Sequence, residues 1–342
     1  MATPAEMSLD SAELQKRVER FQTVRDGILA QVQQVIVGQE EVLDQILTAL
    51  FVGGHCLITG LPGTAKTLMV RTISQTLGLE FRRIQFTPDL MPSDITGTDI
   101  IEEDTTTGRR KWTFVPGPIF GNILLADEIN RTPPKTQSAL LEAMQELSCT
   151  VRGNHYKLPA PFFVLATQNP IELEGTYPLP EAQLDRFLFN TVLDYLSAEE
   201  ELKVIDLTTT VKSAQVRAVT NAEEILDFQR LVRMVPIADS LAQYVVRLVR
   251  ATRFKNPDAP EVVKKYVNYG GSVRAAQFIV LSAKARALSR RRYHVTYEDV
   301  ASLAIPVLRH RILLNFHAES DRIDSDEILR QLIQTLPPPK AA

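Results

Sequence analysis

A glycine- and proline-rich turn ends in a lysine and a hydroxyl in Gly60-Leu61-Pro62-Gly63-Thr64-Ala65-Lys66-Thr67. The apolar residues 55–59 before it suit a buried strand, and the apolar spacing of residues 68–77 after it suits a helix. A phosphate-binding loop needs this order, because backbone N–H groups of the turn and the positive end of the helix surround the phosphates. We expect Lys66 to reach the β- and γ-phosphates of a nucleotide and the Thr67 hydroxyl to lie on Mg²⁺. The alternative for this stretch alone is a strand-to-helix turn that binds nothing.

One position in the turn departs from the usual pattern, because Ala65 stands where glycine is common. Alanine adopts helical φ and ψ at little cost. We therefore expect Ala65 to lie at the start of the helix with ordinary helical backbone angles.

Two acids follow an apolar strand in Ile123-Leu124-Leu125-Ala126-Asp127-Glu128. Ligands of open α/β sheets bind at the carboxyl edge of the strands, so both acids should lie at the ligand edge. We expect Asp127 to hold Mg²⁺ through its hydration shell and Glu128 to orient and deprotonate the attacking water. A second apolar strand, residues 162–167, ends in Gln168-Asn169-Pro170 and places a polar amide at the same edge. Two acids at a solvated strand end are common alone, but the turn upstream makes this pair specific.

Helices predicted at residues 11–35 and 40–52 precede the first strand, and residues 81–86 form the second strand. Residues 87–121 make a long connection without one continuous helical pattern. Within it, residues 99–115 look like an inserted hairpin that turns at 104–108, and an ordinary surface excursion is the alternative. A second hairpin is predicted at residues 149–158, with Gly153-Asn154 as its two-residue turn.

The composition fits a large globular chain of two domains, with 342 residues and 44% hydrophobic content. A net charge of −3 gives no general attraction to nucleic acid or anionic membranes. No apolar run approaches the ~20 residues that span a bilayer. The two cysteines, Cys56 and Cys149, lack metal-ligand spacing. We predict a soluble, cytoplasmic protein.

The order of these features resembles AAA+ ATPases and, within them, the MoxR family, from about residue 35 to 313. Its specific stretches are the glycine-rich turn, Gly117-Pro118-Ile119-Phe120, residues 125–134, 137–146, 166–170 and 177–187. The resemblance implies an α/β fold with a five-stranded parallel sheet and an all-helical lid. It divides the chain into an N-terminal helix (1–34), an ATPase core (35–196) and a lid (197–342). The core carries a helix-2 insert (87–115) and a hairpin before sensor 1 (149–158).

The resemblance also implies the ligands and the role of each site residue. ATP and Mg²⁺ would be held by the adenine-side turn and the two Walker motifs, which are Val37, Gly38, Gly60, Pro62, Gly63, Thr64, Ala65, Lys66, Thr67 and Asp127. Glu128 would be the catalytic base, Asn169 sensor 1, Arg186 the arginine finger of the neighbouring subunit's site, and Arg274 sensor 2. Arg274 could act in cis or in trans. Arg131 is a second candidate for a trans contact. Its alternative role is to bond the loop that carries Asp127 and Glu128.

The function implied is an ATP hydrolase that assembles into a ring, by analogy a hexamer, and remodels or activates a client protein. Relatives of this kind act as chaperones for metal- or cofactor-dependent complexes, with von Willebrand factor A domain proteins as partners. A DNA-dependent motor related to minichromosome maintenance helicases, a magnesium-chelatase-like subunit and a non-hydrolysing scaffold are the alternatives. The net charge argues against the motor, and the intact Asp127-Glu128 pair argues against the scaffold.

Overall fold

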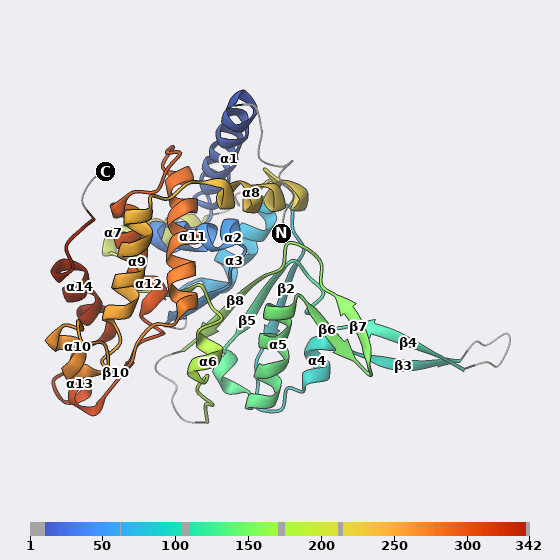
Figure 1. The fold of residues 1–342 in the computed structure, drawn as a ribbon. Helices are drawn as coiled ribbons and strands as arrows, with labels where there is room; N and C mark the ends of the chain where they lie inside the picture. The colour runs from blue at the N-terminus through green and yellow to red at the C-terminus, as the bar shows by residue number, and fades with distance from the viewer. Residues whose placement is uncertain (1–10, 62, 104–109, 170–174, 211–214, 340–342) are drawn as a thin grey trace. The chain divides into compact units, whose positions relative to one another are not determined.

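The structure is a computed structural model that describes residues 11–61, 63–103, 110–169, 175–210 and 215–339. Pro62, Pro170 and the predicted turn at 104–108 lie outside the described residues. The chain divides into two compact units (Figure 1). One unit is Val32–Ala222, and the other joins Met1–Gln31 to Glu223–Ala342.

The Val32–Ala222 unit is built on a parallel sheet of five strands in the order β2-β5-β8-β1-β9. The strands are β1 (Cys56–Gly60), β2 (Phe81–Gln85), β5 (Ile123–Asp127), β8 (Phe163–Gln168) and β9 (Phe189–Leu193). The inner strands β5 and β8 are buried almost throughout, as their continuous apolar sequences require in a sheet covered on both faces. The predicted five-stranded parallel sheet is confirmed. The glycine-rich turn follows the carboxyl end of β1 and the two acids lie at the carboxyl end of β5, on either side of β8.

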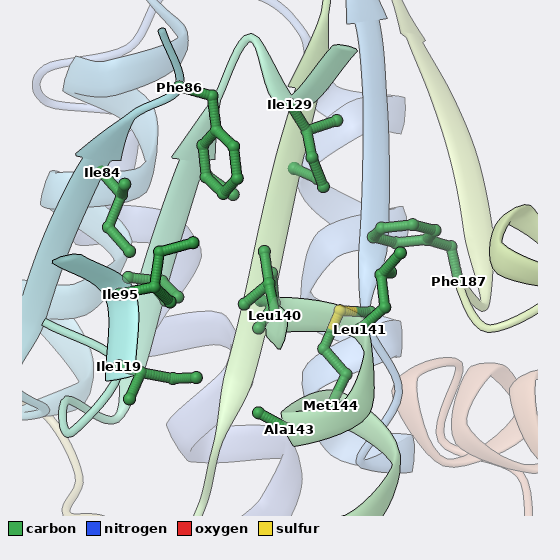
Figure 2. Close-up of a cluster of buried hydrophobic side chains, with 14 of the residues drawn as sticks. Ile84, Phe86, Ile95, Ile119, Ile129, Leu140, Leu141, Ala143, Met144 and Phe187 are labelled. Carbon is green, nitrogen blue, oxygen red and sulfur yellow. The ribbon is translucent and has the colours of Figure 1, made fainter. Parts of the chain in front are cut away.

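Helices cover both faces of this sheet. The helices α2 (Glu40–Val52) and α3 (Lys66–Leu77) pack on one face, and α5 (Pro134–Glu146) packs on the other. Figure 2 shows the cluster under α5, where Leu140, Leu141 and Met144 lie against side chains from the sheet. Burying each of these side chains contributes about 1.5–3 kcal/mol. The cluster fixes α5, and with it the loop that follows the two acids.

Two hairpins are added to the sheet. The helix α4 (Pro92–Thr96) leads into β3 (Gly97–Glu103) and β4 (Arg110–Pro116), and the second hairpin is β6 (Ser148–Val151) and β7 (Asn154–Lys157). Both hairpins were predicted, but the position of the second turn was wrong by one residue. Val151 pairs with Asn154, so the turn is Arg152-Gly153, at φ 49° and 85°. Two positive φ angles match the twist of a tight hairpin, and Gly153 takes the larger one without strain.

The two hairpins contact each other through aromatic side chains. The rings of Phe114 and Tyr156 stack with centroids 4.0 Å apart, and the Arg152 guanidinium lies 4.2 Å from the centroid of the Trp112 ring. Such stacking contributes about 0.5–1.5 kcal/mol per aromatic pair beyond area burial. The insert hairpin and the β6–β7 hairpin are therefore attached to each other side by side (Figure 1).

The compact units divide the chain differently from the predicted domains at residue 197. The helices α6 (Glu181–Leu184) and α7 (Ala198–Thr208) both belong to the Val32–Ala222 unit. The Glu200 carboxylate of α7 packs so closely on Gly38 that a Cβ there would lie 2.3 Å from it. Farther along, the Val219 N–H donates to the Thr76 carbonyl of α3 at 2.8 Å. These contacts hold the segment that the sequence assigned to the lid.

The second unit is largely helical. Its elements are α1 (Ser11–Val32), α8 (Ala222–Met234), α9 (Asp239–Ala251), α10 (Glu261–Tyr266), α11 (Val273–Ser289), α12 (Tyr297–Leu308), α13 (Phe316–Ser320) and α14 (Ser325–Thr335), with a two-stranded sheet of β10 (Val267–Tyr269) and β11 (Leu313–Leu314). The helix α1 packs on α8. The Phe21 and Phe228 rings meet edge to face at 5.2 Å, and Arg17 pairs with Asp227 at 2.7 Å. The apolar stripe of α1 explains this placement, since that stripe must be buried against another helix.

Among the described residues, no helix has the length and apolar character needed to cross a membrane.

Candidate functional site

The glycine-rich turn links β1 to α3 and folds around its own lysine. Lys66 begins α3, and its Nζ donates to the carbonyl oxygens of Gly60 at 2.6 Å and Leu61 at 3.0 Å. The Thr64 hydroxyl donates to the same Leu61 carbonyl at 2.8 Å. Partial burial lowers the pKa of the Lys66 ammonium, while the charges of Asp127 and Glu128 act in the opposite direction. Lys66 is thus held within the turn by groups that an anion can replace.

Ala65 does not adopt the helical backbone that the sequence predicted. It lies immediately before α3 as the N-cap residue, at φ 57° and ψ 24° in the left-handed region. An L-residue with a Cβ loses about 1–2 kcal/mol there, which is why glycine is common at such positions. The turn must reverse direction between Gly63 (φ 82°) and the first helical residue, and this geometry overrides the preference of alanine.

The two acids stand at the end of β5. Asp127 is the last residue of the strand, and Glu128 follows with φ 57°, also in the left-handed region. Thr167 of β8 joins the two residues: its hydroxyl donates to Asp127 Oδ1 at 2.6 Å and accepts from the Glu128 N–H at 2.8 Å. A non-glycine residue in this conformation persists only when its surroundings hold it, and such strain gathers at functional sites.

Side chains from the edge strand β2 reach both acids. Arg83 donates to Asp127 Oδ2 through Nη2 at 2.7 Å and Nε at 3.2 Å. Gln85 accepts from Arg83 at 2.6 Å and donates to Glu128 Oε2 at 2.8 Å. Arg131, at the end of the 3-10 helix η2 (Ile129–Arg131), also donates to Glu128 Oε2, at 2.9 Å. Each carboxylate is therefore paired with an arginine of the same chain.

A cavity of about 520 Å³ brings the turn and the acids together. Its lining includes Lys66 and Thr67 of the turn, Asp127 and Glu128 after β5, and Asn169 after β8. The described residues contain no group of three or more His, Cys, Asp or Glu side chains that could hold a metal ion. One hydroxyl, one carboxylate and phosphate oxygens are a suitable donor set for Mg²⁺, which takes one or two carboxylates plus substrate phosphates. The residues present fit the predicted cofactor.

A second cavity, of about 440 Å³, borders the other side of the same turn. Its lining is mainly apolar and includes Val37 before α2, Leu68 and Met69 of α3, and Val204 and Ile205 of α7. Gly38 beside it adopts φ 64°, which turns the chain between α1 and α2. A flat heteroaromatic ring suits such an apolar cavity, whereas the polar cavity next to it suits phosphates.

Two predicted arginines are not among the residues that line these cavities. Arg186 follows α6, and its Nη1 donates to the Leu141 carbonyl of α5 at 2.5 Å. Arg274 belongs to the other compact unit, in the first turn of α11, where the Ser272 hydroxyl accepts from its backbone N–H at 3.1 Å. Ser272 is the N-cap residue of that helix, and the roles of Arg186 and Arg274 remain predictions.

Comparisons with known proteins agree with this geometry. Residues 55–189 match the ATPase family associated with various cellular activities (AAA), and residues 259–332 match the AAA lid domain. Chaperone MoxR1 of Mycobacterium tuberculosis is 43% identical over 91% of this chain and 81% of its own length. The chain belongs to the MoxR family of AAA+ ATPases.

Further relatives support the MoxR assignment. Protein MoxR of Methylorubrum extorquens is 27% identical over 90% of this chain and 93% of its own length. A crystal structure from Cytophaga hutchinsonii has a TM-score of 0.90 and 40% identity, and the match covers 97% of this chain and 100% of that one. The MoxR chaperone relatives support an AAA+ ATPase with a chaperone-like role.

Three residues of this MoxR-family site were missed from the sequence: Arg83, Gln85 and Thr167. Arg83 and Gln85 lie two apart on β2, and the register pairs them with Leu125 and Asp127 of β5. The alternation of side chains along a strand could have placed both on one face. That this face lies beside Asp127 and Glu128 follows only from the pairing of β2 with β5. This pairing cannot be read from the sequence.

Proposed function

We propose that the protein hydrolyses ATP in a homo-oligomeric ring and uses the turnover to remodel a client protein. The observation that carries this proposal is the polar cavity of about 520 Å³, whose lining combines Lys66 and Thr67 with Asp127 and Glu128. Phosphoryl transfer to water needs positioning and charge neutralisation more than covalent chemistry, and these residue types supply both.

Each of these residues has a distinct task in the proposed mechanism. Lys66 would leave the Gly60 and Leu61 carbonyls and bind the phosphates, while Thr67 and Asp127 would hold Mg²⁺. The bound Mg²⁺ would neutralise charge on the phosphates. Glu128 orients the attacking water and accepts its proton. Asn169, at the end of β8, helps to position that water.

The neighbouring subunit would complete the site. Arg186 is absent from the lining of both cavities in its own chain, which is compatible with an arginine finger that serves an adjacent subunit. Arg274 would act as sensor 2. A ring, by family analogy a hexamer, provides the repeated interfaces that this arrangement needs.

The insert hairpin is the proposed client-contacting element. Four large apolar side chains on β3 and β4 are exposed, which are Ile100, Ile101, Trp112 and Val115. Exposed apolar side chains gathered on one hairpin suit contact with another protein. A von Willebrand factor A domain protein or a metalloenzyme complex is the client class that family analogy favours, in the cytoplasm.

Two measurements test the proposal. The first is steady-state ATP hydrolysis by the parent, Lys66→Ala and Glu128→Gln proteins, together with their mass in the presence of ATP. We expect turnover only in the parent, and assembly in the parent and in Glu128→Gln. The second is client capture: a protein retained by Glu128→Gln with ATP and absent with Lys66→Ala is the candidate client. A parent protein that neither hydrolyses ATP nor assembles would contradict the proposal.

A further inference from the structure

Asp127 is paired with a guanidinium at the carboxylate where Mg²⁺ would be held. Asp127 Oδ2 accepts two hydrogen bonds from Arg83, at 2.7 and 3.2 Å, and Oδ1 accepts one from Thr167 at 2.6 Å. Both carboxylate oxygens are thus bonded to protein donors. A two-donor arginine contact of this kind matches the shape and charge of a carboxylate.

We propose that Arg83 is an exchangeable counter-ion for Asp127, which neutralises this carboxylate when no divalent cation is held and releases it when Mg²⁺ binds with the nucleotide. This inference rests on the proposed function, because it takes Asp127 as a residue that holds Mg²⁺. It adds a residue, Arg83, that controls how strongly nucleotide binding depends on the cation.

The surroundings of Arg83 suit an exchange rather than a permanent ion pair. Its side chain is 45% exposed, and β2 is an edge strand of the sheet. The Asp127 side chain is 13% exposed, so the pair is solvated from the arginine side only. Such a partly buried pair is easier to separate than a fully buried one. Gln85 Oε1 lies 2.6 Å from Arg83 Nη2 and offers a neutral partner that keeps the guanidinium beside the cavity after release.

The electrostatics predict a particular signature. Without Mg²⁺, the phosphates of the nucleotide and the Asp127 carboxylate repel each other across the cavity, and the Arg83 charge reduces that repulsion. With Mg²⁺ bound, the cation itself neutralises Asp127 and the phosphates, so Arg83 contributes little. Loss of Arg83 should therefore weaken nucleotide binding only in the absence of Mg²⁺.

Fluorescence titration with the N-methylanthraniloyl derivative of the non-hydrolysable analogue AMP-PNP tests this, once in EDTA and once at saturating Mg²⁺. For Arg83→Gln we expect binding in EDTA to weaken about fivefold to tenfold, and binding with Mg²⁺ to change less than about twofold. Arg82→Gln is the matched control, because Arg82 is the preceding residue of β2, is 53% exposed and pairs with Glu80. The control should bind like the parent under both conditions. Arg83→Lys keeps the charge and should restore part of the binding in EDTA.

Two results would overturn the inference. If Arg83→Gln binds the nucleotide more weakly than the parent at saturating Mg²⁺, Arg83 is a phosphate ligand. If Arg83→Gln and the parent bind equally well in EDTA, Arg83 has no role in cation exchange. Thermal midpoints of all variants establish that they are folded. A parent protein that fails to bind the nucleotide at saturating Mg²⁺ would instead contradict the proposed function, so the two failures are distinguishable.

Discussion

The Gln85 amide nitrogen lies 2.8 Å from Glu128 Oε2, and the Arg131 guanidinium donates to the same oxygen at 2.9 Å. One oxygen of the proposed base is therefore occupied from β2 on one side and from η2 on the other. Both donors belong to the same chain, so the fold itself orients the Glu128 carboxylate at the end of β5.

We expect Glu128→Gln to bind ATP with an affinity close to that of the parent but to hydrolyse it at least ~100-fold more slowly, because the general base is lost. The amide keeps the size of the side chain, so the left-handed backbone at this position is disturbed little. Glu146→Gln, an exposed acid of α5, is the control and should hydrolyse ATP at the parent rate. A Glu128→Gln protein with near-parent turnover would remove Glu128 from the mechanism.

Arg186→Ala should still bind nucleotide but lose hydrolysis by ~10³-fold or more, the range that arginine fingers supply. Mixing Arg186→Ala with Lys66→Ala subunits should restore part of the activity, because some interfaces then combine an intact nucleotide site with an intact arginine. The thermal midpoint of Arg186→Ala must be followed as well, since Arg186 also bonds the Leu141 carbonyl. Full turnover by a monomeric Arg186→Ala protein is incompatible with a role in trans.

His55 should make the stability of the Val32–Ala222 unit depend on pH. Burial lowers its pKa from 6.5 to about 4; Nε2 bonds the Met144 carbonyl, and Nδ1 accepts from the Val164 N–H. Between pH 6.5 and 4 the unfolded chain binds a proton that the folded chain does not. The contribution of His55 to the free energy of unfolding is thus fully present above pH 6.5. It falls by about 3 kcal/mol as the pH drops to 4.

The His55→Gln variant isolates this contribution. It should be less stable than the parent at pH 7, because glutamine does not reproduce both ring hydrogen bonds. The difference in unfolding free energy between the two proteins should shrink by about 3 kcal/mol between pH 7 and pH 4. Chemical denaturation at several pH values measures it. A difference that stays constant over this range would mean that His55 titrates normally in the folded protein.

Ala65→Gly should stabilise the protein or leave it unchanged, unlike most substitutions to glycine near a helix. Glycine relieves about 1–2 kcal/mol at φ 57° and loses about 0.4–1 kcal/mol through the greater freedom of the unfolded chain. The expected net gain is about 1 kcal/mol in unfolding free energy. Ala143→Gly, at a buried position in the last turn of α5, is the control and should be clearly destabilised. Equal destabilisation by both substitutions would contradict the left-handed conformation of Ala65.

Local patterns predicted the elements of this fold well. The apolar run before Asp127 predicted a buried strand, and it placed the acids at the correct edge of the sheet. The backbone at Ala65 could not be predicted in this way, because a turn between two fixed elements imposes φ regardless of the preference of the residue. Arg152 is a similar case: the hairpin was expected, but the register of β6 and β7 moved the turn onto it.

Contacts between distant segments were harder to predict from the sequence. Arg83 and Gln85 have ordinary polar side chains on a short strand, and only the β2–β5 pairing makes them partners of Asp127 and Glu128. The helix α1 was correctly predicted as amphipathic, but its apolar stripe does not indicate which helix it packs against. Its partner, Phe228 of α8, is about two hundred residues away in the chain, and only the folded unit reveals the pair.

The insert hairpin offers a test of how the protein remodels its client. Residues 104–109 join β3 to β4, and replacing them with Asn-Gly would close the strands with a two-residue turn that matches their twist. The terminal pair Glu103 and Arg110, 3.2 Å apart, would be kept. Basal hydrolysis should stay within about threefold of the parent, because no group of the nucleotide site is touched. Remodelling of the client identified with Glu128→Gln should be lost.

Trp112→Ala, made in the hairpin of natural length, distinguishes the role of residues 104–109 from the role of Trp112. Arg152 lies over the Trp112 ring, so this variant loosens the contact between the two hairpins and leaves residues 104–109 intact. A cation–π contact at an exposed site contributes about 0.5–1 kcal/mol, so the fold should survive. If only the shortened variant loses client remodelling, residues 104–109 are the part that the client needs. If both lose it, Trp112 is needed as well, either as an exposed client contact or through its contact with Arg152. Normal remodelling by the shortened variant would make the hairpin structural and direct the search for the client-contacting surface to the helical unit.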